Sequence, residues 1–143
     1  MRRGVTFAVC ALIGSAAAAQ QFDYGISGMF GKANRTDLPP LTLSSGKPVA
    51  EAPYILKSGG YYRIEIEADG TMSSGLTGAD FFHAVWVKSV EIDDIEIVAT
   101  GLQSINLEEG DAEISFIAIQ PGTYTLSIPG STGDTQKAVF TIQ

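Results

Sequence analysis

The feature that most constrains the fold is a series of short β-rich runs separated by glycine and proline turns. The clearest run is YYRIEIEA, residues 61–68, in which apolar and charged side chains alternate strictly after the first tyrosine. Such alternation predicts a strand with one buried face and one solvated face. Gly59-Gly60 before the run and Asp69-Gly70 after it are turn signals.

Further runs of this kind continue to the end of the chain. The run AEISFIAI, residues 112–119, is apolar on both faces and predicts a central strand that is covered on both sides. One short turn of helix is expected around residues 78–82. Many short strands with such turns predict an all-β fold, a Greek-key β-sandwich of about seven to nine strands. The expected strands are residues 41–43, 52–57, 61–68, 83–92, 94–99, 103–107, 112–119, 123–128 and 137–142.

The first 19 residues have the pattern of a secretory signal peptide. Arg2 and Arg3 precede an apolar run, and Ser15–Ala19 supplies the small residues of a cleavage site. The apolar run has about 11 residues, whereas a membrane-spanning helix needs about 20. We therefore expect cleavage after Ala19 and export of residues 20–143, with no transmembrane segment left after signal removal. A retained membrane anchor is the alternative.

Removal of the signal peptide changes the chemistry of the chain. Cys10 is the only cysteine, so the exported chain would have no disulfide, no thiolate metal site and no cysteine nucleophile. Loss of Arg2 and Arg3 leaves 7 of the 9 basic residues against 16 acidic ones, a formal charge of −9. Nucleic acid and anionic lipid are therefore unfavourable partners, and a cationic protein or a metal ion is electrostatically easier.

Residues 20–40 are expected to be an N-terminal arm or linker in front of one domain, residues 41–143. The arm has three glycines and two prolines and shows no clear period. It also carries apolar side chains that could pack either on the domain itself or on another chain. These are Phe22, Tyr24, Ile26, Met29 and Phe30.

The stretch LEEGDAEISFIAIQPGTYTLSIPG, residues 107–130, resembles the C-terminal half of a cupredoxin. In that family a Leu-x-x-Gly turn leads into an apolar strand, and a Pro-Gly-x-Tyr corner, here residues 121–124, precedes the ligand loop. Upstream, LTGADFF, residues 76–82, is similar to the F-x-A-P-E-F-F segment of some periplasmic cupredoxin-like proteins. PYILKSGGYYRIEI, residues 53–66, resembles the strand pair before it. The resemblance covers residues 50–143 and implies a cupredoxin-like sandwich in the bacterial periplasm, with secretion as the alternative.

The resemblance also implies where blue-copper ligands would lie, and all four positions depart from the family pattern. Such a site needs two imidazoles and a thiolate, usually with a weak axial thioether. The first histidine would fall near Ser74, the cysteine at Ile128, the second histidine near Ser131 and the methionine near Asp134 or Thr135. We therefore expect a cupredoxin frame without a blue-copper site and without a cofactor.

Other metal chemistry depends on few side chains. His83 is the only histidine, and with Met72, Met29 or nearby acids it is the candidate for an open site for copper or another cation. The acidic runs at residues 91–96 and 108–113 offer carboxylate oxygens, which suit calcium. Neither run has the spacing of an EF-hand loop, and both alternate with apolar residues as on the solvated face of a strand.

We expect no enzyme and no catalytic residue. The exported chain has no cysteine nucleophile, and no nucleophile-elbow motif is present. A serine acting with His83 and an acid, or two carboxylates acting on a glycoside, stays open as the enzymatic alternative.

Aromatic side chains are the strongest candidates for binding. In an alternating strand, one member of each of the adjacent pairs at residues 61–62 and 81–82 would face away from the core, and exposed aromatic residues are enriched at protein interfaces. The sequence thus predicts an exported, non-catalytic binding module that docks on another periplasmic protein or complex. The alternative is a periplasmic protein that handles copper or another cation at a non-blue site. The candidates for partner contact are Tyr61, Phe81, Trp86 and Phe30.

Overall fold

The computed structural model describes residues 28–98 and 101–143. The predicted signal peptide, its cleavage site and residues 20–27 of the predicted arm lie outside the described residues. Within the described ranges, the only α-helix is six residues long, and no helix has the length and apolarity needed to cross a membrane.

Nine strands, one short α-helix and two 3-10 turns make up the described chain. The strands are β1 (Arg35–Asp37), β2 (Leu41–Leu43), β3 (Tyr54–Leu56), β4 (Tyr61–Thr77), β5 (Val85–Ile92), β6 (Ile95–Ile97), β7 (Ser104–Ala118), β8 (Gly122–Ser127) and β9 (Lys137–Ile142). The helix α1 is Ala79–Ala84, and the 3-10 turns are η1 (Lys32–Asn34) and η2 (Asp134–Gln136).

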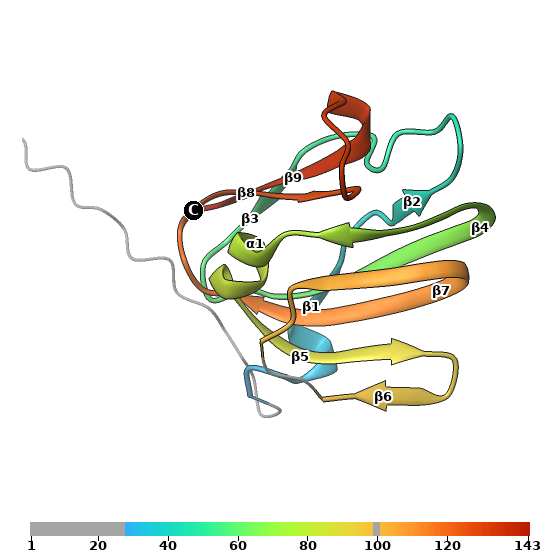
Figure 1. Cartoon of the computed structure of the whole chain (residues 1–143). Helices are drawn as coiled ribbons and strands as arrows, with labels where there is room; N and C mark the ends of the chain where they lie inside the picture. Colours follow the sequence, from blue (N-terminus) through green and yellow to red (C-terminus); the bar gives the residue numbers. More distant parts are fainter. Residues whose placement is uncertain (1–27, 99–100) are drawn as a thin grey trace, which may run out of the picture.

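The strands form one hydrogen-bonded sheet that folds over into two layers (Figure 1). Its order is β3-β9-β8-β4-β7-β5-β6, with β1 and β2 also paired to β4. Strands β3, β8 and β9 lie in one layer, and β1, β5 and β6 lie in the other (Figure 1). This arrangement confirms the predicted all-β Greek-key sandwich of seven to nine strands.

The two longest strands, β4 and β7, connect the layers because each of them bends back on itself at one end of the molecule (Figure 1). They pair antiparallel from Tyr61 opposite Ile117 to Thr77 opposite Ser104, with a register shift between Asp69 and Ser74. Gly70 and Gly110 lie at the bend with φ of 75° and 102°, backbone angles that glycine adopts without steric cost. The bent ribbon buries apolar side chains on its concave side.

The bend corrects two expected boundaries. Asp69-Gly70 is not the end of a strand, because Asp69 still pairs with Glu109 and the ladder resumes at Ser74. For the same reason the two expected strands at residues 103–107 and 112–119 are one strand, β7. The chain does turn at Gly70 and Gly110, but the bends of β4 and β7 lie next to each other, so the paired strands change direction together and stay paired.

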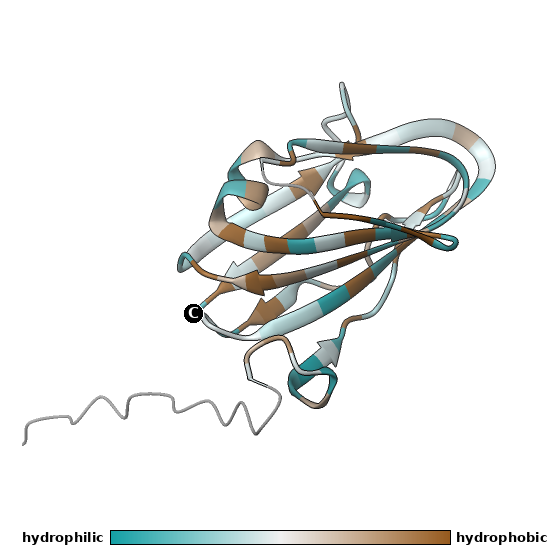
Figure 2. Cartoon of the chain, turned by 90° about the horizontal axis from the view of Figure 1, so that it is seen from below, coloured by the Kyte–Doolittle hydropathy of each residue, from teal (hydrophilic) through white to brown (hydrophobic). Residues whose placement is uncertain are grey.

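The core fills the space between the layers. Apolar and polar segments alternate along the strands (Figure 2), as the period of two requires. The ring of Phe81 in α1 lies 5.6 Å from that of Phe116 in β7 and 4.4 Å from that of Phe140 in β9, measured between centroids. The helix α1 therefore closes one end of the core, and the short helical turn expected around residues 78–82 is confirmed at residues 79–84.

Part of the expected N-terminal arm belongs to the sandwich. Strand β1 pairs parallel to β4 at Tyr61–Arg63, and β2 pairs parallel to the same strand at Ile66–Ala68. Pro39 and Pro40 lie between β1 and β2, and proline has no backbone N–H to donate to a ladder. Residues 35–43 thus form an interrupted edge along β4.

Candidate functional site

The end of the sandwich that carries the bend of β4 is where the cupredoxin resemblance places the copper ligands. Ile128, Met72 and Thr135 line one hollow there, with a volume of about 260 Å³. Ser74 lines another hollow together with Pro129. The positions that the resemblance singled out are thus gathered around the β8–β9 connection and the bend of β4.

The side chains at these positions do not fit a blue-copper site. The Met72 hollow is lined otherwise by hydroxyl, amide, amine and aliphatic side chains, and an isoleucine stands where the thiolate would be. The hydroxyl of Ser131, at the place of the second imidazole, donates a hydrogen bond of 2.8 Å to the carbonyl oxygen of Ile128. One thioether without imidazole or thiolate does not meet the requirement of such a site.

Asp69 organises this end by hydrogen bonding. Its carboxylate accepts a hydrogen bond of 2.5 Å from the hydroxyl of Ser44 and others from the hydroxyl and the backbone N–H of Thr71. The backbone N–H of Ser45 in turn donates to the Thr71 hydroxyl at 2.9 Å. The hydrogen bonds from Ser44 and Thr71 lower the pKa of Asp69 to about 2. This acid therefore joins the loop after β2 to the bend of β4.

The two weak metal candidates are not brought together. His83 is exposed on α1 and lines a polar hollow of about 580 Å³ with Asp80 and Tyr124. Met72 lies between Asp69 and Ser74, where the β4–β7 register shifts in the bend of β4. Figure 1 shows α1 and this bend at opposite ends of the sandwich. In residues 28–98 and 101–143, no three His, Cys, Asp or Glu side chains are grouped so as to hold a metal ion. The structure thus assembles neither the His83–Met72 site nor a calcium site from the two acidic runs.

A different constellation lies on the outer face of the β4–β7–β5 layer, and we call its first part the aromatic patch: Phe30, Tyr61, Trp86 and Ile117. Register places Tyr61 of β4, Ile117 of β7 and Trp86 of β5 in one row across the strands. The Phe30 ring meets those of Tyr61 and Trp86 edge-on, with centroids 5.7 and 5.3 Å away. Ile117 and Tyr61 are buried, whereas Trp86 stays 53% exposed.

Three of the four residues expected to contact a partner thus lie together, and the fourth does not. Phe81 is 1% exposed because it lies on α1 with its ring against the core. The expectation that one member of each aromatic pair faces away from the core is therefore wrong for Phe81-Phe82, since both rings are buried. The side chains of Tyr61 and Tyr62 do point to opposite faces of β4, but Phe30 packs against Tyr61 on the outer face.

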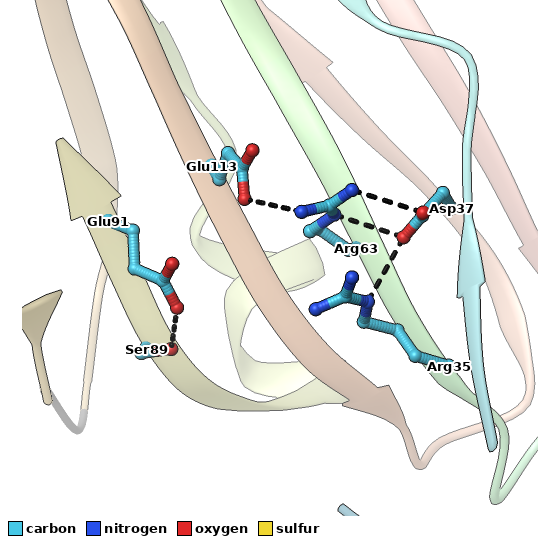
Figure 3. A network of polar contacts seen from close by, with 6 residues as sticks. All are labelled: Arg35, Asp37, Arg63, Ser89, Glu91 and Glu113. Carbon is cyan, nitrogen blue, oxygen red and sulfur yellow. Dashed lines mark hydrogen bonds and ion pairs between the residues drawn. The ribbon is translucent and has the colours of Figure 1, made fainter. Parts of the chain in front are cut away.

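Arg35, Asp37, Arg63 and Glu113 form an ion-pair network (Figure 3). Arg63 lies two residues from Tyr61 on β4, so the network adjoins the aromatic patch on the same face of the sheet. The Arg63 guanidinium donates to both carboxylate oxygens of Asp37 at 3.0 Å and to Glu113 at 2.9 Å. Arg35 donates to Asp37 at 3.0 Å. Desolvation acts to raise the pKa of Asp37, but hydrogen bonds and charge from Arg63 and Arg35 outweigh it, so this pKa lies below its ordinary value. The network attaches β1 to β4 and β7.

Beyond the network the face becomes acidic, and we call Glu65, Glu67, Asp111 and Glu113 the acidic rows. Register sets Glu65 opposite Glu113 and Glu67 opposite Asp111. Like charges directly opposite each other on paired strands destabilise a sheet. Burial, and then the charges of Glu67, Asp111 and Glu113, raise the pKa of Glu65 despite the nearby Arg63. One sheet face therefore passes from apolar to ion-paired to acidic.

Comparison with known proteins supports the fold and stops there. No protein-family profile matches the sequence, and no curated protein is significantly similar to it. Among solved structures, the chain is similar to a multicopper oxidase from Pseudomonas thermotolerans, with a TM-score of 0.57 and 18% identity over 78% of this chain and 30% of that one. A laccase-like multicopper oxidase, CueO, from Ochrobactrum sp. gives a TM-score of 0.56 and 9% identity over 79% of this chain and 32% of that one.

A copper nitrite reductase from Nitrosomonas europaea is similar with a TM-score of 0.50 and 20% identity, over 66% of this chain and 33% of that one. The chain thus spans about a third of the length of these proteins. At such identities the likeness shows a cupredoxin-like fold, as the sequence predicted, and does not transfer an activity.

Proposed function

We propose that the protein is an exported, non-catalytic binding module of cupredoxin-like fold that docks on another protein of the bacterial periplasm or of the secreted fraction. The observation that carries the proposal is Trp86, a tryptophan that is 53% exposed within a patch of other aromatic side chains. Tryptophan is enriched among the residues that contribute most to protein–protein binding. The proposal includes no catalytic residue and no resident cofactor.

Two further observations support this proposal. The end of the sandwich where a cupredoxin would hold copper carries isoleucine and serine instead of cysteine and histidine. This end therefore does not favour a copper-binding function. The chain has 16 acidic residues against 9 basic ones, which disfavours nucleic acid and anionic lipid as partners. A protein surface is the partner that the aromatic patch fits.

Site-specific photo-cross-linking tests the proposal. A photoreactive amino acid replaces Trp86, and in a matched variant it replaces Ile55, another exposed apolar side chain at 61%, which lies on the edge strand at the other end of the sheet order. We expect one discrete adduct with an exported protein from position 86 and none from position 55. Absence of an adduct at position 86, or the same adducts from both positions, would contradict docking at this face.

A further inference from the structure

The outer face of the β4–β7–β5 layer has a fixed spacing between its apolar part and its acidic part. Ile117, Glu113 and Asp111 lie on the same face of β7, four and six residues apart. At about 3.3 Å per residue, the two carboxylates lie about 13 and 20 Å along the strand from the row of Trp86. An extended segment laid along β7 has the same rise and presents side chains of one face at the same intervals.

The acidic rows have little positive charge of their own. Arg63 pairs with Glu113, while the described residues provide no ion pair to Glu65, Glu67 or Asp111. Directly opposed carboxylates repel one another across the strands, so the folded chain gains when a cation lies between them. The aromatic patch supplies the complementary apolar contact, because Trp86 leaves about half of its surface uncovered.

From this spacing and charge we infer that the partner presents an extended basic segment with one apolar side chain. The apolar side chain packs on Trp86 and Phe30, and lysine or arginine residues four and six positions away meet the acidic rows. The inference rests on the docking function proposed above and deepens it by stating the chemistry of the partner. A segment that matches only one of the two parts loses the contacts of the other.

Trp86 is the only tryptophan of the chain, so its fluorescence reports on this face alone. The probes are three blocked peptides: Leu-Thr-Ser-Thr-Lys-Thr-Lys, and the same sequence with both lysines replaced by glutamine or by glutamate. We expect the lysine peptide to change the Trp86 emission saturably, and the glutamine peptide to bind about three- to tenfold more weakly, as two exposed ion pairs are lost. The glutamate peptide should not bind.

The matched variants remove the same charge from different places. Glu67→Gln with Asp111→Asn removes one of the two opposed pairs, and should weaken the lysine peptide about two- to fivefold and reduce its salt dependence. Glu51→Gln with Asp134→Asn removes two carboxylates away from this face and should leave binding unchanged. Both proteins are checked by thermal melting, and we expect the acidic-row variant to melt no lower than the wild type because it loses an opposed like-charge pair.

Several results would overturn the inference. These are equal binding of the lysine and glutamine peptides, unchanged binding in the acidic-row variant, a melting temperature lowered by that variant, or no saturable binding of any peptide. Calcium chloride that alone reproduces the emission change and blocks the peptide would identify a cation site instead. In each of these cases a position-specific adduct at residue 86 would still support docking, so the two proposals fail separately.

Discussion

Asp69 is the residue whose environment departs most clearly from that of an ordinary surface acid. Although solvent-exposed, it accepts hydrogen bonds from Ser44 and from Thr71, and these lower its pKa to about 2. A lowered pKa in the folded state means that the ionised form stabilises the fold. The stabilisation is present above the ordinary value of 3.8 and is lost as the pH falls towards 2.

Replacing Asp69 by asparagine should therefore lower stability at neutral pH and remove part of its acid dependence. Urea unfolding followed between neutral pH and pH 2 measures both effects. As the pH falls from 3.8 to about 2, the wild type should lose more stability than Asp69→Asn, because only the wild type has this carboxylate to protonate. Curves of equal slope in that range would show that the hydrogen bonds to Ser44 and Thr71 contribute nothing.

Glu65 is the opposite case, because burial and the surrounding acids raise its pKa above 4.5. Below that ordinary pKa the carboxyl group is protonated in both the folded and the unfolded state and does not destabilise the fold. Stability falls as the pH rises through the raised pKa of the folded state. Glu65→Gln should thus stabilise the protein at neutral pH by about 0.2–1 kcal/mol. The gain should disappear in acid. A variant that is less stable than the wild type at neutral pH would contradict this account.

At the scale of elements, the segment before β2 is held on the outer face by two kinds of contact. Arg63 and Asp37 connect β1 to β4, and the ring of Phe30 packs edge-on against the rings of Tyr61 and Trp86. Both contacts lie on the face of β4 that is turned away from the main core. The segment therefore completes a second, smaller aromatic cluster, in which Phe30 helps to bury Tyr61.

Phe30→Ala should open this cluster. We expect a loss of about 1–2 kcal/mol, as for a partly buried phenylalanine, a red shift of the Trp86 emission and greater quenching of it by acrylamide. Lys32→Ala, an exposed position in the same segment, serves as the control and should change neither property. If Phe30→Ala leaves emission and quenching as in the wild type, the segment does not cover Trp86 in solution.

At the scale of the whole molecule, the protein combines a cupredoxin-like fold with a loop end at which the described residues supply neither imidazole nor thiolate donors. We expect titration with copper to produce neither the blue absorption of a thiolate site nor a stoichiometric rise in melting temperature, because tight binding to the folded state would raise it. His83→Ala should behave like the wild type. A stoichiometric rise that His83→Ala abolishes would instead favour the metal-handling alternative.

Much of this architecture follows from local sequence. Strict alternation in residues 61–68 requires one buried and one wet face whatever the strand pairs with, and most strands appear where such runs occur. The absence of cysteine after residue 10 and of a second histidine is likewise a matter of composition, and the prediction of a protein without a blue-copper site rests on it.

The candidate site was predictable only in part. The sequence identifies Trp86, Tyr61 and Phe30 as aromatic residues on or near strands. Whether they contact one another depends on the registers of β4, β7 and β5 and on the path of residues 28–37 over the sheet. Phe81 was misassigned because residues 81–82 lie on a helix that caps the core, where neighbouring rings are both buried. The predicted strand ends near Asp69 and Gly110 were wrong. A local turn signal does not show that the two strands are paired and bend together without ending.

The sequence by itself determined the strand pattern, the acidic charge and the missing copper ligands, since these depend on residue type and on spacing of a few positions. Only the tertiary structure decided that β4 and β7 bend side by side and that Glu65 faces Glu113 and Glu67 faces Asp111. It also decided that the aromatic patch lies at one end of the same sheet face. The physical reason is that cross-strand register joins residues about 30 to 60 positions apart, and the free energy that selects this register comes from packing that no local pattern contains.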